Sequence, residues 1–155
     1  MANHKSDYAK GIRQMPVAGG SELVSIRMEV SLPASHALND IVEFGELPQD
    51  HVPVDFVLDS AALAASAMVL AVALLNAGKT DLSADADDGG ASWLTGSTIG
   101  VAGGIARPTV RAMWLTKPKP ATKRMVGAKI TTGGVTPAAG VLALTLIYRA
   151  AAHGG

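Results

Sequence analysis

Strict alternation of apolar and polar residues marks the clearest element of the chain, between Glu22 and Pro33. The apolar positions of this segment are Val24, Ile26, Met28, Val30 and Leu32, and the residues between them are polar. Successive side chains of a β-strand point to opposite faces, so a period of two residues over this length predicts a half-buried strand.

The segment 40–59, DIVEFGELPQDHVPVDFVLD, holds two β-rich runs on either side of a tight connector. The runs are 41–47 and 52–58. Pro48 and Pro53 punctuate the segment, and proline has a fixed φ and no N–H to donate. Both prolines therefore belong at strand ends, edges or turns. The pattern predicts either a β-hairpin or a corner between two strands.

Later segments add further strands. Alternation predicts strands at 124–131 and 140–149. In the last of these, Leu142, Leu144, Leu146 and Tyr148 share one face, and the other face is also largely apolar. This predicts a central strand between layers or a strand at a subunit interface. The segment 109–116 is another candidate strand with Trp114 partly buried, and 96–104 is expected to be a surface loop or a bulged strand.

The apolar segment 61–77, AALAASAMVLAVALLNA, is open to two interpretations. Ala and Leu favour a helix, and about 17 residues is the lower limit for a membrane span, which leaves a small holin-like membrane protein as an alternative. Val69 and Val72 are β-branched, and the apolar run 68–75 is short enough for a buried strand. We favour a turn near 60–66 followed by a buried strand.

About seven or eight strands, with turns every 8–12 residues or so, predict an all-β fold. The expected architecture is a jelly-roll-like antiparallel β-sandwich with an extended N-terminal arm. The polar first residues end near Gly19 and Gly20, so residues 1–21 are expected to form a flexible or extended arm and residues 22–152 the sandwich domain.

Composition narrows the possible partners. The chain has 13 basic and 13 acidic residues and a formal net charge of zero, so no electrostatic footprint for nucleic acid is expected. It contains no cysteine, which excludes disulfides and thiolate chemistry. The first residues lack the apolar core of a secretory signal, which fits assembly in the cytoplasm.

No catalytic, cofactor-binding or metal-binding set can be assembled from the sequence, and we predict a non-enzymatic protein without a cofactor. The segment 73–80 fits a relaxed phosphate-loop template, but Leu74 and Leu75 stand where a flexible loop is needed. The segment 85–89 resembles a calcium loop with one residue too few, and Gly96 replaces the bidentate Glu, so a solvated acidic loop is expected. The histidines do not combine at metal-ligand spacing: they are His4, His36, His51 and His153.

Five basic residues and one histidine are the candidate interface residues. They are Lys5, Lys10 and Arg13 in the arm, His51 near the predicted turn, Arg107 after the GGIA segment and Arg149 after the last strand. The rigid fork of an arginine suits carboxylates across an interface. A lone arginine is more often a solvated charge with a packed stem.

Four segments, in their order along the chain, resemble small structural proteins of tailed bacteriophages, especially capsid decoration or cement proteins. They are 41–55 (IVEFGELPQDHVPVD), 94–107 (LTGSTIGVAGGIAR), 124–132 (RMVGAKITT) and 137–150 (PAAGVLALTLIYRA). The resemblance covers residues 38–150. It implies a jelly-roll-like β-sandwich on the outer surface of the capsid, commonly a homotrimer at three-fold or quasi-three-fold positions.

The resemblance implies that the major capsid protein and further copies of the chain are the partners, with no nucleic acid or membrane among them. Such a virion protein would clamp neighbouring capsomers, and many weak repeated contacts would stabilise the shell. The arm could extend over a neighbouring subunit and order on assembly. A head–tail joining or tail-associated structural protein is the alternative in the same class.

Overall fold

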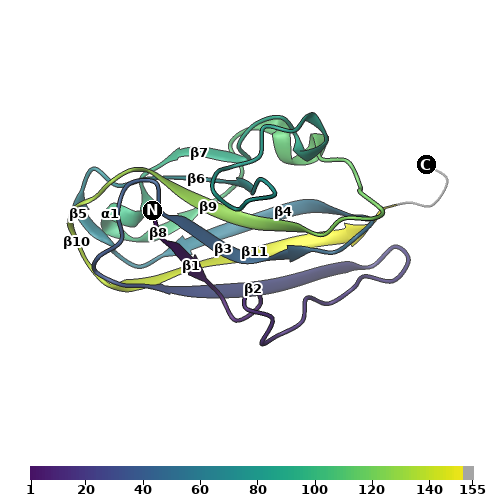
Figure 1. Cartoon of the computed structure of the whole chain (residues 1–155), viewed down its shortest axis with the longest axis horizontal. Helices are drawn as coiled ribbons and strands as arrows, with labels where there is room; N and C mark the ends of the chain where they lie inside the picture. Colours follow the sequence, from purple (N-terminus) through teal and green to yellow (C-terminus); the bar gives the residue numbers. More distant parts are fainter. Residues whose placement is uncertain (152–155) are drawn as a thin grey trace.

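Residues 1–151, which the computed structural model describes, form two β-sheets that face each other (Figure 1). In chain order the elements are β1 (Asn3–Lys5), β2 (Leu23–Leu32), β3 (Ile41–Leu47), β4 (His51–Ser60), β5 (Ala64–Ser66), β6 (Val69–Leu74), η1 (Ala86–Asp88), β7 (Leu94–Ser97), α1 (Ile99–Ala102), β8 (Gly104–Ala106), η2 (Arg111–Leu115), β9 (Arg124–Thr132), β10 (Val135–Pro137) and β11 (Gly140–Ala150). Residue 152 of the predicted domain and His153 lie outside the described residues.

The first sheet runs β1-β3-β9-β6-β7 and the second runs β2-β11-β4-β8, while β10 and β5 pair separately at one end (Figure 1). Neighbouring strands are antiparallel except for β1, which runs parallel to β3. The predicted all-β, jelly-roll-like antiparallel sandwich is confirmed. The structure has more strands than predicted because four strands, β1, β5, β8 and β10, are only three residues long. Such strands are too short to show an alternating pattern.

One continuous core lies between the two sheets. Its largest fully buried side chains include Met28, Phe44, Phe56, Trp93 and Tyr148, which come from both sheets and from the loop before β7. In β2 the alternating apolar residues face this core and the polar ones face outward, as predicted. The last strand, β11, is central, since it pairs with β2 on one side and β4 on the other.

The two runs around Pro48 form a corner and not a hairpin. The first run, β3, belongs to one sheet, and the second run, β4, belongs to the other. Asp50 takes the left-handed conformation at this turn, with φ of 57°. Farther on, the register of β4 against β11 shifts between Pro53 and Asp55, so Pro53 lies next to a β-bulge, where the missing ladder bond is tolerated.

The buried strand predicted in 61–77 is confirmed as β6, while β5 occupies the last part of the predicted turn near 60–66. Five of the six residues of β6 are buried, and the strand pairs with β9 and β7. Tertiary burial thus outweighs the helix propensity of Ala and Leu. The helix on which the membrane alternative depended is not formed, and among residues 1–151 no helix is long and apolar enough to cross a bilayer.

Two predictions about the later loops are wrong. The segment 109–116 contains a 3₁₀ helix, η2, and Trp114 on it is 58% exposed. Pro108 and Pro118 bracket the segment, and only Ala112 and Met113 of the helix are buried, so it contributes one edge to the core and no strand. The segment 96–104 includes the helical turn α1, in which a side chain on Gly100 would collide with Met68.

Candidate functional site

The N-terminal segment 1–21 lies against its own sandwich. Strand β1 adds to the free edge of β3, and Asp40 fastens it with hydrogen bonds from Ala2 N–H (2.7 Å) and from His4 Nε2 (3.0 Å). The same carboxylate accepts a bond from Ala37 N–H at 3.0 Å. Burial of the carboxyl group opposes ionisation, but the bonds from His4, Ala2 and Ala37 outweigh it and lower the pKa of Asp40.

A second set of bonds holds the rest of the segment. His51, 3% exposed, accepts a hydrogen bond from Ala18 N–H at Nε2 (3.0 Å), and its Nδ1 lies 2.6 Å from the Gln49 carbonyl. The Tyr148 hydroxyl donates to the Pro16 carbonyl. Burial, with a smaller contribution from Tyr8, raises the pKa of Tyr148 to about 12, so the phenol keeps the proton it donates. His51 therefore anchors the arm within the molecule.

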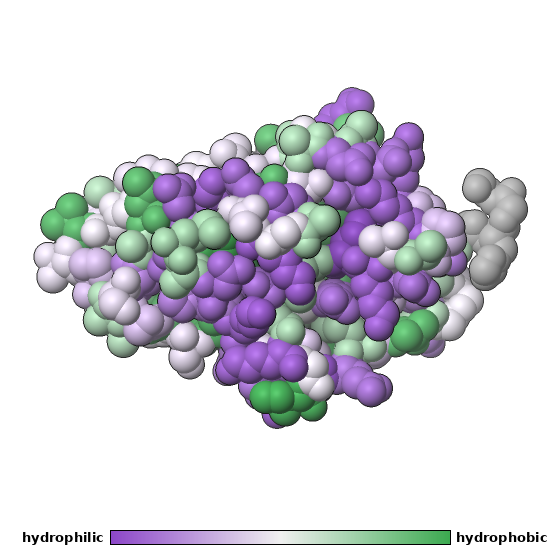
Figure 2. All heavy atoms as spheres, in the orientation of Figure 1, coloured by the Kyte–Doolittle hydropathy of each residue, from purple (hydrophilic) through white to green (hydrophobic). Residues whose placement is uncertain are grey.

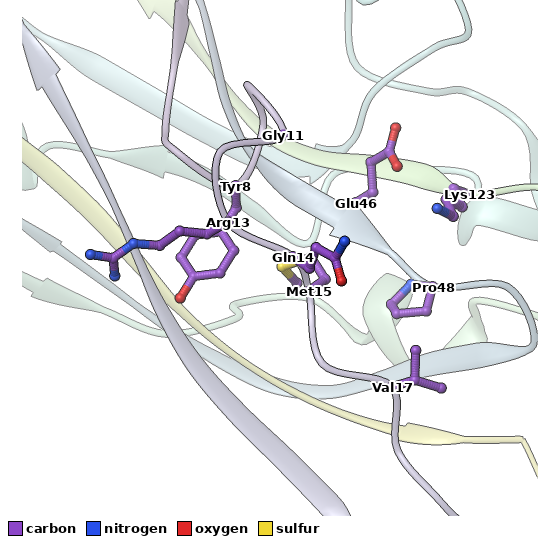
Figure 3. Close-up of a pocket in the computed structure, with 9 residues that line it drawn as sticks. All are labelled: Tyr8, Gly11, Arg13, Gln14, Met15, Val17, Glu46, Pro48 and Lys123. Atoms are coloured by element: carbon purple, nitrogen blue, oxygen red, sulfur yellow. The ribbon is translucent and has the colours of Figure 1, made fainter.

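A hollow of about 410 Å³ lies between the arm and the end of β3 (Figure 3). Arg13 stacks over Tyr8, with 6.0 Å from its guanidinium carbon to the ring centroid, and extends away from Glu46 and Lys123. The other lining residues are Gly11, Gln14, Met15, Val17 and Pro48. These side chains include no base–nucleophile pair. Within residues 1–151, no group of three His, Cys, Asp or Glu residues is arranged to hold a metal ion.

The remaining candidate interface residues are scattered over the surface. Lys5 Nζ lies 3.8 Å from the buried carboxylate of Glu43, and Lys10 is exposed. Arg107 is exposed and forms an ion pair with Asp55 at 3.0 Å. The structure thus gives Lys5 and Arg107 partners within the chain and does not bring the six candidates together.

Arg149 lines a second hollow, which the sequence did not reveal and which we call the Trp114 groove. It measures about 570 Å³ and is lined by Val52, Pro53, Val54, Trp114, Leu115, Thr116, Lys117, Pro118, Arg149 and Ala151. Trp114 is 58% exposed and Leu115 46% exposed. The indole N–H donates to the Val54 carbonyl at 3.0 Å, which fixes the ring at the rim of the groove. Two basic residues and no acidic residue line it.

A buried ion cluster holds the segment that carries Trp114. Asp88, 6% exposed, lies 2.8 Å from Arg124 Nη1 and 3.3 Å from Lys119 Nζ, and it accepts a bond from Ser83 Oγ at 2.6 Å. Burial opposes ionisation of Asp88, but the bonds from Ser83, Arg124 and Lys119 lower its pKa. The predicted solvated acidic loop is therefore wrong for Asp88.

The same cluster reaches the residues just after η2. Arg124 Nη2 donates to the Lys117 carbonyl at 2.9 Å, and Lys117 N–H donates to the Asp87 carbonyl at 2.8 Å. The Trp114 groove is thus positioned by Asp88, which the sequence pattern assigned to an acidic loop, and by Arg124, which it assigned to the start of a strand. No sequence signal marked η2, because Pro108 and Pro118 lie just outside the segment 109–116 and are equally compatible with strand ends.

The fold of this chain matches that of chains in two solved phage capsids. A chain in the capsid of Ralstonia phage GP4 matches with a TM-score of 0.82 and 29% identity, over 97% of this chain and 99% of that one. A chain in the cyanophage Pam1 capsid asymmetric unit matches with a TM-score of 0.63 and 20% identity, over 88% and 91% of the two chains, which shows the fold alone.

The match to the GP4 capsid chain confirms the resemblance to phage capsid-associated proteins that was found in the sequence. No protein-family model and no curated protein matches the chain.

Proposed function

We propose that the chain is a non-enzymatic virion protein that decorates the outer surface of a phage capsid and cements neighbouring major capsid proteins. The observation that carries this proposal is the match to the GP4 capsid chain over nearly the full length of both chains. The described residues also lack a nucleophile–base constellation in either hollow, while they expose an apolar, basic groove suited to a protein partner.

The Trp114 groove is the surface that we assign to the shell. Trp and Arg are the residue types that most often dominate binding energy at protein interfaces, and Trp114 and Arg149 line the same groove. Its basic lining suits a segment of the major capsid protein that carries carboxylates beside apolar side chains. The groove is rigid at its rim, so little conformational entropy is lost on binding.

The test uses phage shells assembled without this chain, to which the purified protein is added. We expect saturable binding and shells that resist heat or denaturant better than bare ones. Trp114→Ala should weaken binding by about 2 kcal/mol or more, which is about thirtyfold. Occupancy per shell, measured by gel densitometry over a concentration series, gives the affinity.

Ile12→Ala is the matched control, since Ile12 is also an exposed apolar residue, at 70%, but lies in the arm. Equal binding by Trp114→Ala and wild type would remove the groove from the contact. Failure of the wild type to bind shells would overturn the decoration proposal. Cryo-electron microscopy density only at the portal or tail would instead favour the head–tail joining alternative.

The resemblance also suggests a homotrimer of this chain and no nucleic acid or membrane partner, and both belong to the proposal. Closed cyclic oligomers place several shell-binding grooves on one rigid body, so that weak single contacts add up to stable attachment. Mass measurement in solution and on the shell tests the trimer. A monomer in both settings would contradict it.

A further inference from the structure

One end of the sandwich carries no charged residue. Four segments meet there, and none contains Asp, Glu, Lys or Arg. They are 33–39 (PASHALN), 60–68 (SAALAASAM), 95–106 (TGSTIGVAGGIA) and 130–142 (ITTGGVTPAAGVL). We call this end the uncharged tip. All 26 charged residues of the chain lie outside these segments.

The four segments are bonded into one structure. Strands β5 and β10 pair through Ala64 with Pro137 and Ser66 with Val135. Leu63 N–H donates to the Gly100 carbonyl at 2.7 Å, and Ala138 N–H donates to the Leu63 carbonyl at 2.7 Å. His36, 2% exposed, joins the first segment through its Nε2, 2.9 Å from the Leu63 carbonyl. Figure 1 shows β5, β10, α1 and β8 together at the left end.

The surface of the uncharged tip is apolar. Its exposed large side chains are Leu38 (51%), Ile105 (69%), Val135 (55%) and Val141 (36%). In Figure 2 the left extremity is mostly white, pale and green, while strong purple covers the middle and right of the same face. Charges begin at the border, where Asp59 is already paired with Arg27 at 2.7 Å. An apolar centre with paired charges around it is the usual anatomy of a protein interface.

Two non-glycine residues of the uncharged tip have left-handed backbone conformations. Ala67 and Thr136 hold positive φ angles of 66° and 49°, although neither is glycine. They directly follow Ser66 and Val135, the residues that pair β5 with β10. Such conformations cost about 1–3 kcal/mol each and concentrate at functional surfaces. Both residues lie in segments of the uncharged tip, so the strained backbone and the uncharged surface coincide.

We propose that the uncharged tip is the surface through which copies of this chain meet around a rotation axis. This rests on the self-association included in the proposed function. Residues close to such an axis meet their own copies, so every charge there faces a like charge and loses water as well. An uncharged apolar surface avoids both costs. The Trp114 groove differs in character, since its lining includes Arg149 and also Lys117, which pairs with Asp87 at 3.1 Å, so it suits a foreign partner that brings a carboxylate beside apolar side chains.

The test introduces a charge at the uncharged tip and measures mass by analytical ultracentrifugation. Val135→Asp should weaken self-association about a hundredfold or more, because its copies bring carboxylates together near the axis. Val135→Thr, which keeps a branched uncharged side chain, should form oligomers of wild-type size. Leu38→Asp is a second variant outside the β5–β10 pair, so that its result does not depend on β10. Circular dichroism checks that each variant is folded.

Salt provides an independent readout. Contacts without charges should hold from low to high ionic strength, since screening acts on charged pairs. The proposal would be overturned if the wild-type oligomer dissociated on addition of salt. It would also be overturned if both Asp variants formed oligomers of wild-type size. If the free wild type is a monomer, cryo-electron microscopy of decorated shells decides: density must place the uncharged tips of neighbouring copies together, and tips that face the shell would overturn the inference.

Shell binding distinguishes this inference from the proposed function. Folded Val135→Asp protein that still occupies shells, with weaker attachment, supports decoration and self-association through the uncharged tip together. Wild type that forms oligomers through the tip but never binds shells would overturn decoration and leave the inference standing.

Discussion

At the scale of single residues, Asp40 fastens the start of the N-terminal segment to the sandwich. It accepts three hydrogen bonds, two of them from residues of the arm, Ala2 and His4. The sequence showed an acidic residue at the start of a strand and nothing more. No local pattern indicates that Asp40 bonds to residues 36 and 38 positions away, because such a partner is set by the folded topology alone.

Asp40 should make the docking of the arm sensitive to acid. The bonds hold the pKa of the folded carboxyl below its ordinary value of 3.8, so their stabilisation is complete above that pH. It is lost as the pH falls from about 3.8 through the lower folded pKa. Protection of the Ala2 amide from hydrogen exchange, relative to the intrinsic rate at each pH, should therefore fall below this range and be highest above it.

Asp40→Asn should leave the Ala2 amide with low, pH-independent protection from exchange and lower the free energy of unfolding by about 1–3 kcal/mol. Asp7→Asn is the control, since the Asp7 side chain is exposed on the same segment. An acid response that persists in Asp40→Asn would assign it to another group.

At the scale of elements, the sequence was sufficient where burial follows alternation. Strands β2, β9 and β11 came from the period of two residues, and β6 came from a short apolar run with β-branched residues. Strand β1 could not be found, because three polar residues, Asn3 to Lys5, form a strand only through the edge of β3. The 3₁₀ helix η2 was missed because its position depends on Arg124 and Asp88, which lie outside the helix.

Arg124→Met should destabilise the protein strongly. It leaves the buried Asp88 without its closest cation and the Lys117 carbonyl without a donor. Breaking a buried pair in this way costs about 3–5 kcal/mol. Lys129→Met on the same strand is the control, since Lys129 pairs with the exposed Asp81 and such surface pairs contribute about 0–1 kcal/mol.

Chemical denaturation measures both variants, and exchange at the Lys117 amide reports on the segment after η2. Equal stability of the two variants would show that the Asp88 cluster does not hold this segment.

At the scale of the whole molecule, the charged residues and the Trp114 groove are separated from the uncharged tip. We therefore expect that each surface can be altered alone. Trp114→Ala should form oligomers of the same size as the wild type. Val135→Asp should keep the near-ultraviolet circular dichroism of the two tryptophans. Well-separated changes usually add within about 0.3–0.5 kcal/mol, so the double variant should show the summed loss of unfolding free energy. A changed mass for Trp114→Ala would contradict this separation.

The corner between β3 and β4 has a mechanical consequence. The backbone passes there from one sheet to the other within the few residues between Leu47 and His51. The sheets are therefore joined by covalent bonds at this end as well as by packed side chains. Tension applied to one sheet at this end is therefore transmitted to the other sheet through the main chain, in addition to the packed core.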